Sequence, residues 1–198
     1  MEEFKNISVI PGPIVRIKNP TCLKLIGKGS QGAVFRLTDK TCVKIFCKRK
    51  SAEKEAEAYE IAGESKVSPK MLEAGANYII LEYIKGIYLD DYLASGSTIT
   101  EKLTLKIMNL LDELKRLGFP RLDPSLRHTI LTKDGDLKII DFVHLLKYNK
   151  RRPSDMFREL GKLNLLKEFA EHVQKLDPMI YREWKDAIDR NLSIAPYK

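Results

Sequence analysis

Apolar and polar residues alternate along much of the first eighty positions, and this alternation is the pattern of half-buried β-strands. Thr21–Ile26, Ala33–Leu37 and Thr41–Phe46 each show the pattern, with a tight turn between the last two. Met71–Ala74 and Asn77–Tyr83 predict a further hairpin-like pair. The first part of the chain is therefore predicted to form an antiparallel sheet.

One helix interrupts these strands and is predicted from residue 51 to about residue 63, with Ser51 as its cap. Glu55 is the exception on its apolar face, because a buried carboxylate needs a partner. That face, defined by i, i+3, i+4 spacing, carries Ala52, Glu55, Ala56, Tyr59 and Ala62.

The second half of the chain is predicted to be mostly helical. Leu89–Ala94 forms a short helix, and Ser97 or Thr98 caps a longer one. Two further helices are predicted over Ser154–Leu176 and Pro178–Leu192. The apolar stripe of the longer helix consists of Leu103, Ile107, Leu110, Leu114 and Leu117.

Three glycines follow the first predicted strand with the spacing G-x-G-x-x-G. Glycines let a backbone turn sharply and approach a ligand closely, and the N–H groups of such a loop can face phosphate oxygens. A dinucleotide-binding loop opens a helix, whereas a strand follows here, as in the nucleotide lobe of protein kinases. A glycine-bearing hairpin without a ligand is the alternative. The predicted nucleotide-binding residues are Ile26, Gly27, Lys28, Gly29, Ser30, Gln31, Gly32 and Val34.

Phosphoryl transfer from ATP also needs a lysine held by a glutamate. Lys44 lies in a predicted strand with apolar neighbours on both sides, and Glu55 faces the same sheet from the following helix. The two side chains are therefore predicted to pair. An edge-strand lysine and a solvated glutamate are the alternatives.

Adenine recognition needs backbone donors and acceptors beyond the end of a strand. Asn77–Tyr83 runs into a glycine-bearing connection of this kind. Glu82, Tyr83 and Ile84 are the predicted hinge, and Leu81 is the side chain predicted to lie behind the adenine ring. ATP is therefore the predicted nucleotide.

Two aspartates complete the predicted chemistry. Asp141 follows the predicted strand Leu137–Ile140, which pairs with Thr129–Leu131, and is the predicted Mg²⁺ ligand. Asp123 lies in the loop after the long helix and is predicted to orient the acceptor hydroxyl. An ordinary strand-ending aspartate and an Asp-Pro turn are the respective alternatives.

In this order the motifs resemble the protein-kinase-like superfamily over roughly residues 21–145. The short second lobe resembles the compact RIO-type and related small atypical kinases of bacteria and archaea, in which, as at Ser125 here, a serine can replace the lysine two places after the catalytic aspartate. The resemblance implies an α+β two-lobe fold. Residues 21–84 would be an N-lobe with an antiparallel sheet and one helix, and 85–198 a small, mostly helical C-lobe. Residues 1–20 carry Pro11, Gly12, Pro13 and Pro20 and are predicted to be an irregular N-terminal arm with a short strand at Ile14–Ile17. Asp123, Lys44 and Glu55 would be the catalytic residues.

Several departures from the family pattern bear on activity. His128 occupies the position of the asparagine that usually holds a second metal ion, which makes it a candidate metal ligand and Mn²⁺ an alternative to Mg²⁺. A histidine that is hydrogen-bonded in the loop is the other interpretation. Arg121-Leu122 replaces the usual His-Arg, and Asp141-Phe142-Val143 replaces Asp-Phe-Gly. Because no Ala-Pro-Glu sequence follows, the platform that docks peptide substrates is predicted to be missing or rebuilt.

Composition sets further limits. The 198 residues have the hydrophobic and charged content of an ordinary globular domain, with no apolar run long enough to span a membrane and no signal-peptide pattern at the start. The three cysteines form no C-x-x-C pair, so a reducing cytoplasm is the expected location. A net charge of +8 favours nucleotide, nucleic acid or an acidic partner, although a solvated surface explains it better than a dedicated nucleic-acid site. The densest basic clusters are Lys48-Arg49-Lys50 and Lys147, Lys150, Arg151 and Arg152.

The leading hypothesis is an ATP-dependent phosphotransferase, most simply a small serine/threonine protein kinase that acts on a protein hydroxyl. The missing peptide-docking segment motivates a second hypothesis, a small-molecule or sugar kinase of the same fold. His128 and Val143 motivate a third, a pseudokinase or nucleotide-dependent binding module.

Overall fold

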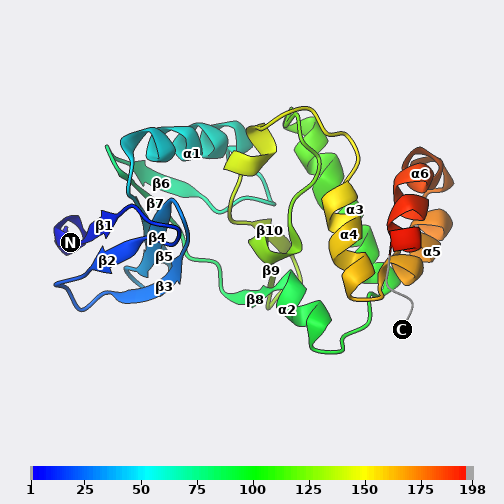
Figure 1. Cartoon of the computed structure of the whole chain (residues 1–198), viewed down its shortest axis with the longest axis horizontal. Helices are drawn as coiled ribbons and strands as arrows, with labels where there is room; N and C mark the ends of the chain where they lie inside the picture. The colour runs from blue at the N-terminus through cyan, green and yellow to red at the C-terminus, as the bar shows by residue number, and fades with distance from the viewer. Residues whose placement is uncertain (1, 195–198) are drawn as a thin grey trace. The chain divides into compact units, whose positions relative to one another are not determined.

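The computed structural model describes residues 2–194 and divides at Ile84 and Lys85 into two compact units (Figure 1). Unit 1, the N-terminal one, is built on a five-stranded antiparallel sheet with β5 at its centre. The first of these strands starts three residues later than the alternation predicts. In spatial order the strands are β3 (Lys24–Lys28), β4 (Gly32–Arg36), β5 (Thr41–Phe46), β7 (Tyr78–Glu82) and β6 (Met71–Ala74).

The helix of unit 1, α1 (Arg49–Ala62), follows β5 and packs against β5, β6 and β7 (Figure 1). Lys48 occupies its N-cap position, so the prediction of Ser51 as the cap is wrong and Ser51 lies inside the first turn. The buried face is close to the predicted one, with Ala58 buried and Ala56 half-buried. Glu55 is among the buried residues.

The N-terminal residues form ordered structure in place of the irregular arm that the prolines suggest. Glu3–Asn6 is a 3₁₀ turn, and β1 (Ser8–Ile10) pairs antiparallel with β2 (Arg16–Lys18). The Val15 N–H donates a hydrogen bond to the Gly29 carbonyl at 2.9 Å, so this segment supports the glycine hairpin. The apolar cluster that it shares with the sheet consists of Phe4, Ile7, Val15, Ala33, Phe35, Val43 and Ile45.

Unit 2 contains a three-stranded antiparallel sheet in the order β10 (Leu137–Ile139), β9 (Thr129–Thr132) and β8 (Gly86–Tyr88). β9 and β10 lie where the sequence predicts, and Gly135 in the turn between them has a φ of 80°, which favours glycine. β8 was not predicted. The short helix α2 (Leu89–Ala94) has its predicted bounds.

Unit 2 also contains longer helices. Thr100 caps the first of them, because its Oγ1 accepts a hydrogen bond from the Leu103 N–H at 3.2 Å. The prediction of Ser97 or Thr98 as the cap is therefore wrong. The helices are α3 (Glu101–Arg116), α4 (Ser154–Lys162), α5 (Leu166–Leu176) and α6 (Pro178–Ile194).

The single helix predicted over Ser154–Leu176 is broken at Asn164 into α4 and α5. Asn164 has a φ of 59°, a left-handed conformation that asparagine adopts more readily than most residues. The break lets aromatic side chains from three helices meet, since the Phe157 ring lies 6.0 Å from Phe169 and 5.7 Å from Trp184.

The described residues thus form an α+β structure with antiparallel sheets, which is compatible with the predicted two-lobe fold. Within residues 2–194, none of the helices combines the length and the apolarity needed to cross a membrane.

Replacing Phe4 by alanine is expected to destabilise unit 1, since its side chain is 3% exposed and its ring meets Tyr78 edge-on at 4.8 Å. Loss of a buried aromatic ring costs about 3–5 kcal/mol of unfolding free energy, which urea denaturation followed by circular dichroism measures. Ile14→Ala is the control, because Ile14 is 57% exposed and its loss should cost less than about 0.5 kcal/mol. Unchanged stability of Phe4→Ala would mean that the N-terminal residues are dispensable.

Candidate active site

The glycine motif forms the hairpin turn between β3 and β4. The Gly29 N–H donates to the Gly32 carbonyl at 2.9 Å and closes the turn. A Cβ on Gly32 would lie 2.5 Å from the Ile45 carbonyl oxygen on β5, whereas a Cβ on Gly29 would meet no atom within 4 Å. Gly32 is therefore required by strand packing, while the backbone at Gly29 is open to close approach by a ligand.

Lys44 and Glu55 are in contact within unit 1. Lys44 pairs with Val34 on β4 and with Ile79 on β7, so it lies on a central strand and the alternative of an edge-strand lysine is excluded. Its Nζ donates a hydrogen bond to Glu55 Oε1 on α1. The two side chains are only 16% and 2% exposed, so the ammonium is the charge partner that the buried carboxylate needs.

The other predicted nucleotide-binding residues of unit 1 lie on the hairpin and at the end of β7. The Glu82 N–H donates to the Lys70 carbonyl and the Tyr83 N–H to the Lys40 carbonyl, both at 2.8 Å. These two donors are engaged by the unit itself, so in this conformation they are not available to an adenine. Ile26 and Val34 are half-buried, and Leu81 is buried.

Asp141 lies between two histidines in unit 2. The Ile140 N–H donates to the His128 carbonyl at 2.9 Å, which keeps the two segments adjacent. Asp141 Oδ2 lies 3.9 Å from His128 Nδ1 and 3.8 Å from His144 Nε2, the latter in the 3₁₀ turn Val143–Leu146. Partial burial lowers the pKa of His144 by more than the charge of Asp141 raises it.

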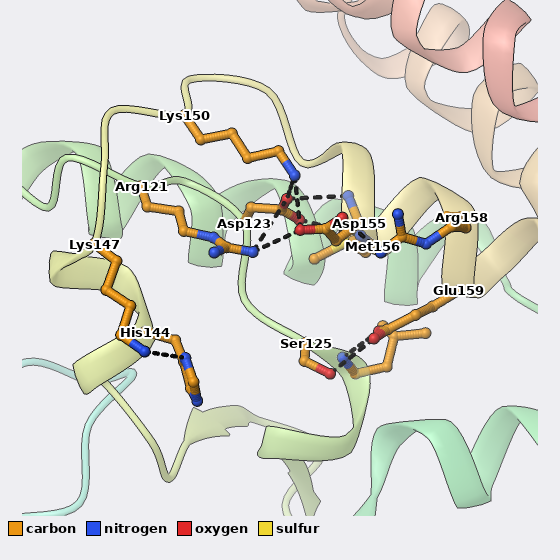
Figure 2. Close-up of polar contacts among 11 residues, drawn as sticks. Arg121, Asp123, Ser125, His144, Lys147, Lys150, Asp155, Met156, Arg158 and Glu159 are labelled. Carbon is orange, nitrogen blue, oxygen red and sulfur yellow. Dashed lines mark hydrogen bonds and ion pairs between the residues drawn. The ribbon is translucent and has the colours of Figure 1, made fainter.

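Asp123 is enclosed by protein (Figure 2). Its Oδ1 accepts the Met156 N–H at 3.1 Å, and its Oδ2 accepts the Asp155 N–H at 3.0 Å and lies 2.6 Å from Lys150 Nζ. The side chain is 0% exposed, and burial raises the pKa of Asp123 against the opposing effect of these contacts. The carboxylate thus caps the N-terminus of α4. In this conformation it cannot contact an acceptor hydroxyl, as its predicted catalytic role requires.

Lys150 and Arg121 supply the cations around this carboxylate. Lys150 Nζ lies 2.7 Å and Arg121 Nη2 2.6 Å from Asp155 Oδ2, and Arg121 is 3.9 Å from Asp123 (Figure 2). The backbones of Arg121 and Lys150 form a parallel bridge, in which the Leu122 N–H donates to the Lys150 carbonyl at 2.7 Å. The segment before α4 is therefore tied to the loop that carries Asp123.

Glu159 on α4 anchors the same loop further along. Its carboxylate accepts hydrogen bonds from Ser125 Oγ at 2.9 Å and from the Leu126 N–H at 2.8 Å (Figure 2). Ser125, which the kinase resemblance places where a lysine is usual, therefore helps to hold the loop.

Sequence reasoning did not identify the site roles of Lys150, Asp155, Glu159 and His144. Lys150 entered the sequence analysis only as part of a basic cluster, and His144 did not enter it. A cationic partner such as Lys150 could have been expected, because a carboxylate buried in a loop needs a cation or several N–H donors. Which of the many basic residues supplies the charge depends on tertiary contacts that the sequence pattern does not reveal.

Comparisons with known proteins give one informative similarity. No protein-family model matches the chain. A Bacillus subtilis (strain 168) protein named "Putative serine/threonine-protein kinase YrzF" is 35% identical over 124 residues, which cover 60% of this chain and 58% of that protein. The match therefore spans less than two thirds of the relative's length. It supports a kinase-like relationship for this chain.

Replacing Asp123 by alanine is expected to lower the free energy of unfolding by about 3–5 kcal/mol, as is typical when one partner of a buried ion pair is removed. The change leaves two N–H groups of α4 uncapped and removes one of the two carboxylates beside Lys150. Urea denaturation measures this loss of unfolding free energy. Asp136→Ala is the control, since Asp136 is 72% exposed in its pair with Lys106 and should cost less than about 1 kcal/mol. An Asp123→Ala variant as stable as the parent would contradict the conclusion that the Asp123 carboxylate is buried and paired.

Proposed function

We propose that this chain is an ATP-dependent phosphotransferase, most simply a serine/threonine protein kinase that transfers the γ-phosphoryl group of ATP to a protein hydroxyl. The similarity to a protein named as a kinase supports the kinase-like part of the proposal. The observation that carries it is the Lys44–Glu55 pair. A lysine on a central strand, held by a buried glutamate and adjacent to a glycine hairpin, is the arrangement that kinases use to bind ATP phosphates.

Each unit supplies its own groups to the proposed reaction. In unit 1, Lys44 would position the α- and β-phosphates together with the backbone of the glycine hairpin, and the segment Glu82–Ile84 would bind adenine. In unit 2, Asp141 would hold the divalent metal ion, which neutralises charge on the transferred phosphoryl group. Catalysis would come from positioning and electrostatic stabilisation, which is what phosphoryl transfer chiefly requires.

Asp123 has a conditional part in this scheme. It would orient the acceptor hydroxyl only after Lys150 and the N-terminus of α4 release its carboxylate. This enclosure favours a second candidate function, a module that binds nucleotide without transferring phosphate. Such a module would keep Lys44 and Glu55 in use and leave Asp123 as a structural cap.

Replacing Lys44 by methionine or Asp141 by alanine is expected to reduce phosphotransfer from radiolabelled ATP by about 10²–10³-fold, because each change removes a charge that stabilises the transition state. Lys54→Met and Asp136→Ala are matched controls, since both residues are exposed, and both should retain activity. The assay pairs a mixture of generic protein substrates with a panel of hydroxylated metabolites. Activity that is indifferent to both Lys44 and Asp141 would exclude the proposed site.

The binding-module alternative predicts a different result with the same purified proteins. ATP would raise the melting temperature of the parent, and Lys44→Met would abolish that shift, with no phosphate transferred to any substrate. Phosphotransfer that is lost in Asp123→Asn while the ATP-induced shift persists would exclude the binding module and support the kinase.

A further inference from the structure

Among the contacts of Asp123, Lys150 is the one that a ligand could replace (Figure 2). Its Nζ lies 2.6 Å from Asp123 Oδ2, a distance at which an acceptor hydroxyl would also donate to that oxygen. The other two donors are the N–H groups of Asp155 and Met156, which belong to the backbone at the start of α4. The Lys150 side chain is 27% exposed, so this ammonium is within reach of solvent although the carboxylate is not.

Lys150 is shared between two carboxylates, and one of them does not depend on it. Asp155 Oδ2 accepts from Lys150 Nζ at 2.7 Å and also from Arg121 Nη2 at 2.6 Å. Asp155 Oδ1 accepts from Arg158 Nη2 at 2.7 Å. Asp155 would therefore keep two guanidinium partners without Lys150. Only Asp123 would lose a close cation, and it would need a new donor in that place.

A replacement has to serve both groups that the separation leaves. Asp123 needs a hydrogen-bond donor, and the Lys150 ammonium needs an anionic acceptor. We propose that the acceptor substrate is a serine or threonine flanked by acidic residues. One of its carboxylates draws Lys150 away from Asp123, and its hydroxyl donates to Asp123 Oδ2 in place of the ammonium. The inference rests on the proposed function in taking Asp123 as the group that orients the acceptor hydroxyl.

The chain around Lys150 fits an acidic peptide better than a small acidic metabolite. Residues 147–152 contain four cations and no carboxylate. Lys147 and Arg151 are exposed, and within residues 2–194 neither forms an ion pair with a carboxylate. A metabolite would engage Lys150 alone, whereas an extended acidic peptide can contact several cations of this segment. Long charged side chains on such a segment attract acidic partners and raise their rate of association.

The test measures the binding of two fluorescein-labelled peptides to the full-length chain by fluorescence anisotropy, without nucleotide. One peptide has a serine flanked by aspartate and glutamate, and the other has asparagine and glutamine at those positions. The acidic peptide is expected to bind at least about tenfold more tightly, as charge-assisted hydrogen bonds allow. Added salt should reduce the difference. Lys150→Met should abolish the difference, and Lys150→Arg should retain it.

Two controls accompany the variants. Lys167 is exposed on α5, so Lys167→Met should keep the parental preference. Replacing the serine of the acidic peptide by alanine should weaken its binding, because Asp123 Oδ2 then gains no donor when Lys150 leaves. The parental preference needs no variant, so the test stays decisive if Lys150→Met does not fold.

Equal binding of both peptides by the parent overturns the proposal, as does a preference that persists in folded Lys150→Met. Tighter binding of single-stranded RNA than of the acidic peptide, lost in Lys150→Met, would also overturn it. Phosphotransfer assays with the same peptides separate this inference from the proposed function. Equal phosphorylation of both peptides would remove only the acidic acceptor. Selective binding that depends on Lys150, without any phosphotransfer, would support recognition by Lys150 and remove only the kinase assignment.

Discussion

The enclosure of one carboxylate organises unit 2. Asp123 has no exposed surface, and a charged group in that situation must be neutralised and hydrogen-bonded within the protein. Two N–H groups of α4 and the Lys150 ammonium meet this requirement. Because the backbone of Lys150 also bridges to Arg121, the same contacts fix the start of α4 and the segment before it against the loop that contains Asp123.

That anchoring extends to His128 and Asp141. The loop from Asp123 runs through Ser125 and Leu126, both held by Glu159, directly into the turn that ends at His128. His128 in turn accepts the Ile140 N–H, which sets Asp141 beside it. The position of the candidate metal ligands is therefore a consequence of how α4 holds the preceding loop.

The structure could be predicted from the sequence where a periodic pattern of apolar residues determines which way side chains point. Lys44 and Glu55 could be paired in advance because strand alternation and helical spacing both point toward one core. Most strands followed from the same patterns, whereas the two-lobe α+β fold was implied by the resemblance to protein kinases. The environment of Asp123 could not be predicted, because its partners lie 27 to 33 residues further along the chain in a segment without periodicity. The N-terminal hairpin was predicted only in part, as a short strand at Ile14–Ile17 that overlaps β2. The prolines suggested irregularity, whereas a few apolar residues, Phe4 among them, determine the packing.

Asp123 and Asp141 of unit 2 differ in burial and in their contacts. This difference limits which of them can bind a ligand. Asp123 is surrounded by donors and has no surface to offer a ligand, whereas Asp141 is partly exposed and has a nitrogen of His128 at 3.9 Å and one of His144 at 3.8 Å. A carboxylate that already holds an ammonium and two N–H groups would lose those bonds in order to accept a substrate hydroxyl, which opposes its use as a base. Of these two carboxylates, Asp141 is therefore the one that a ligand could reach in this conformation. Any phosphotransfer must either couple acceptor binding to the release of Asp123 or proceed on metal and phosphate positioning without it.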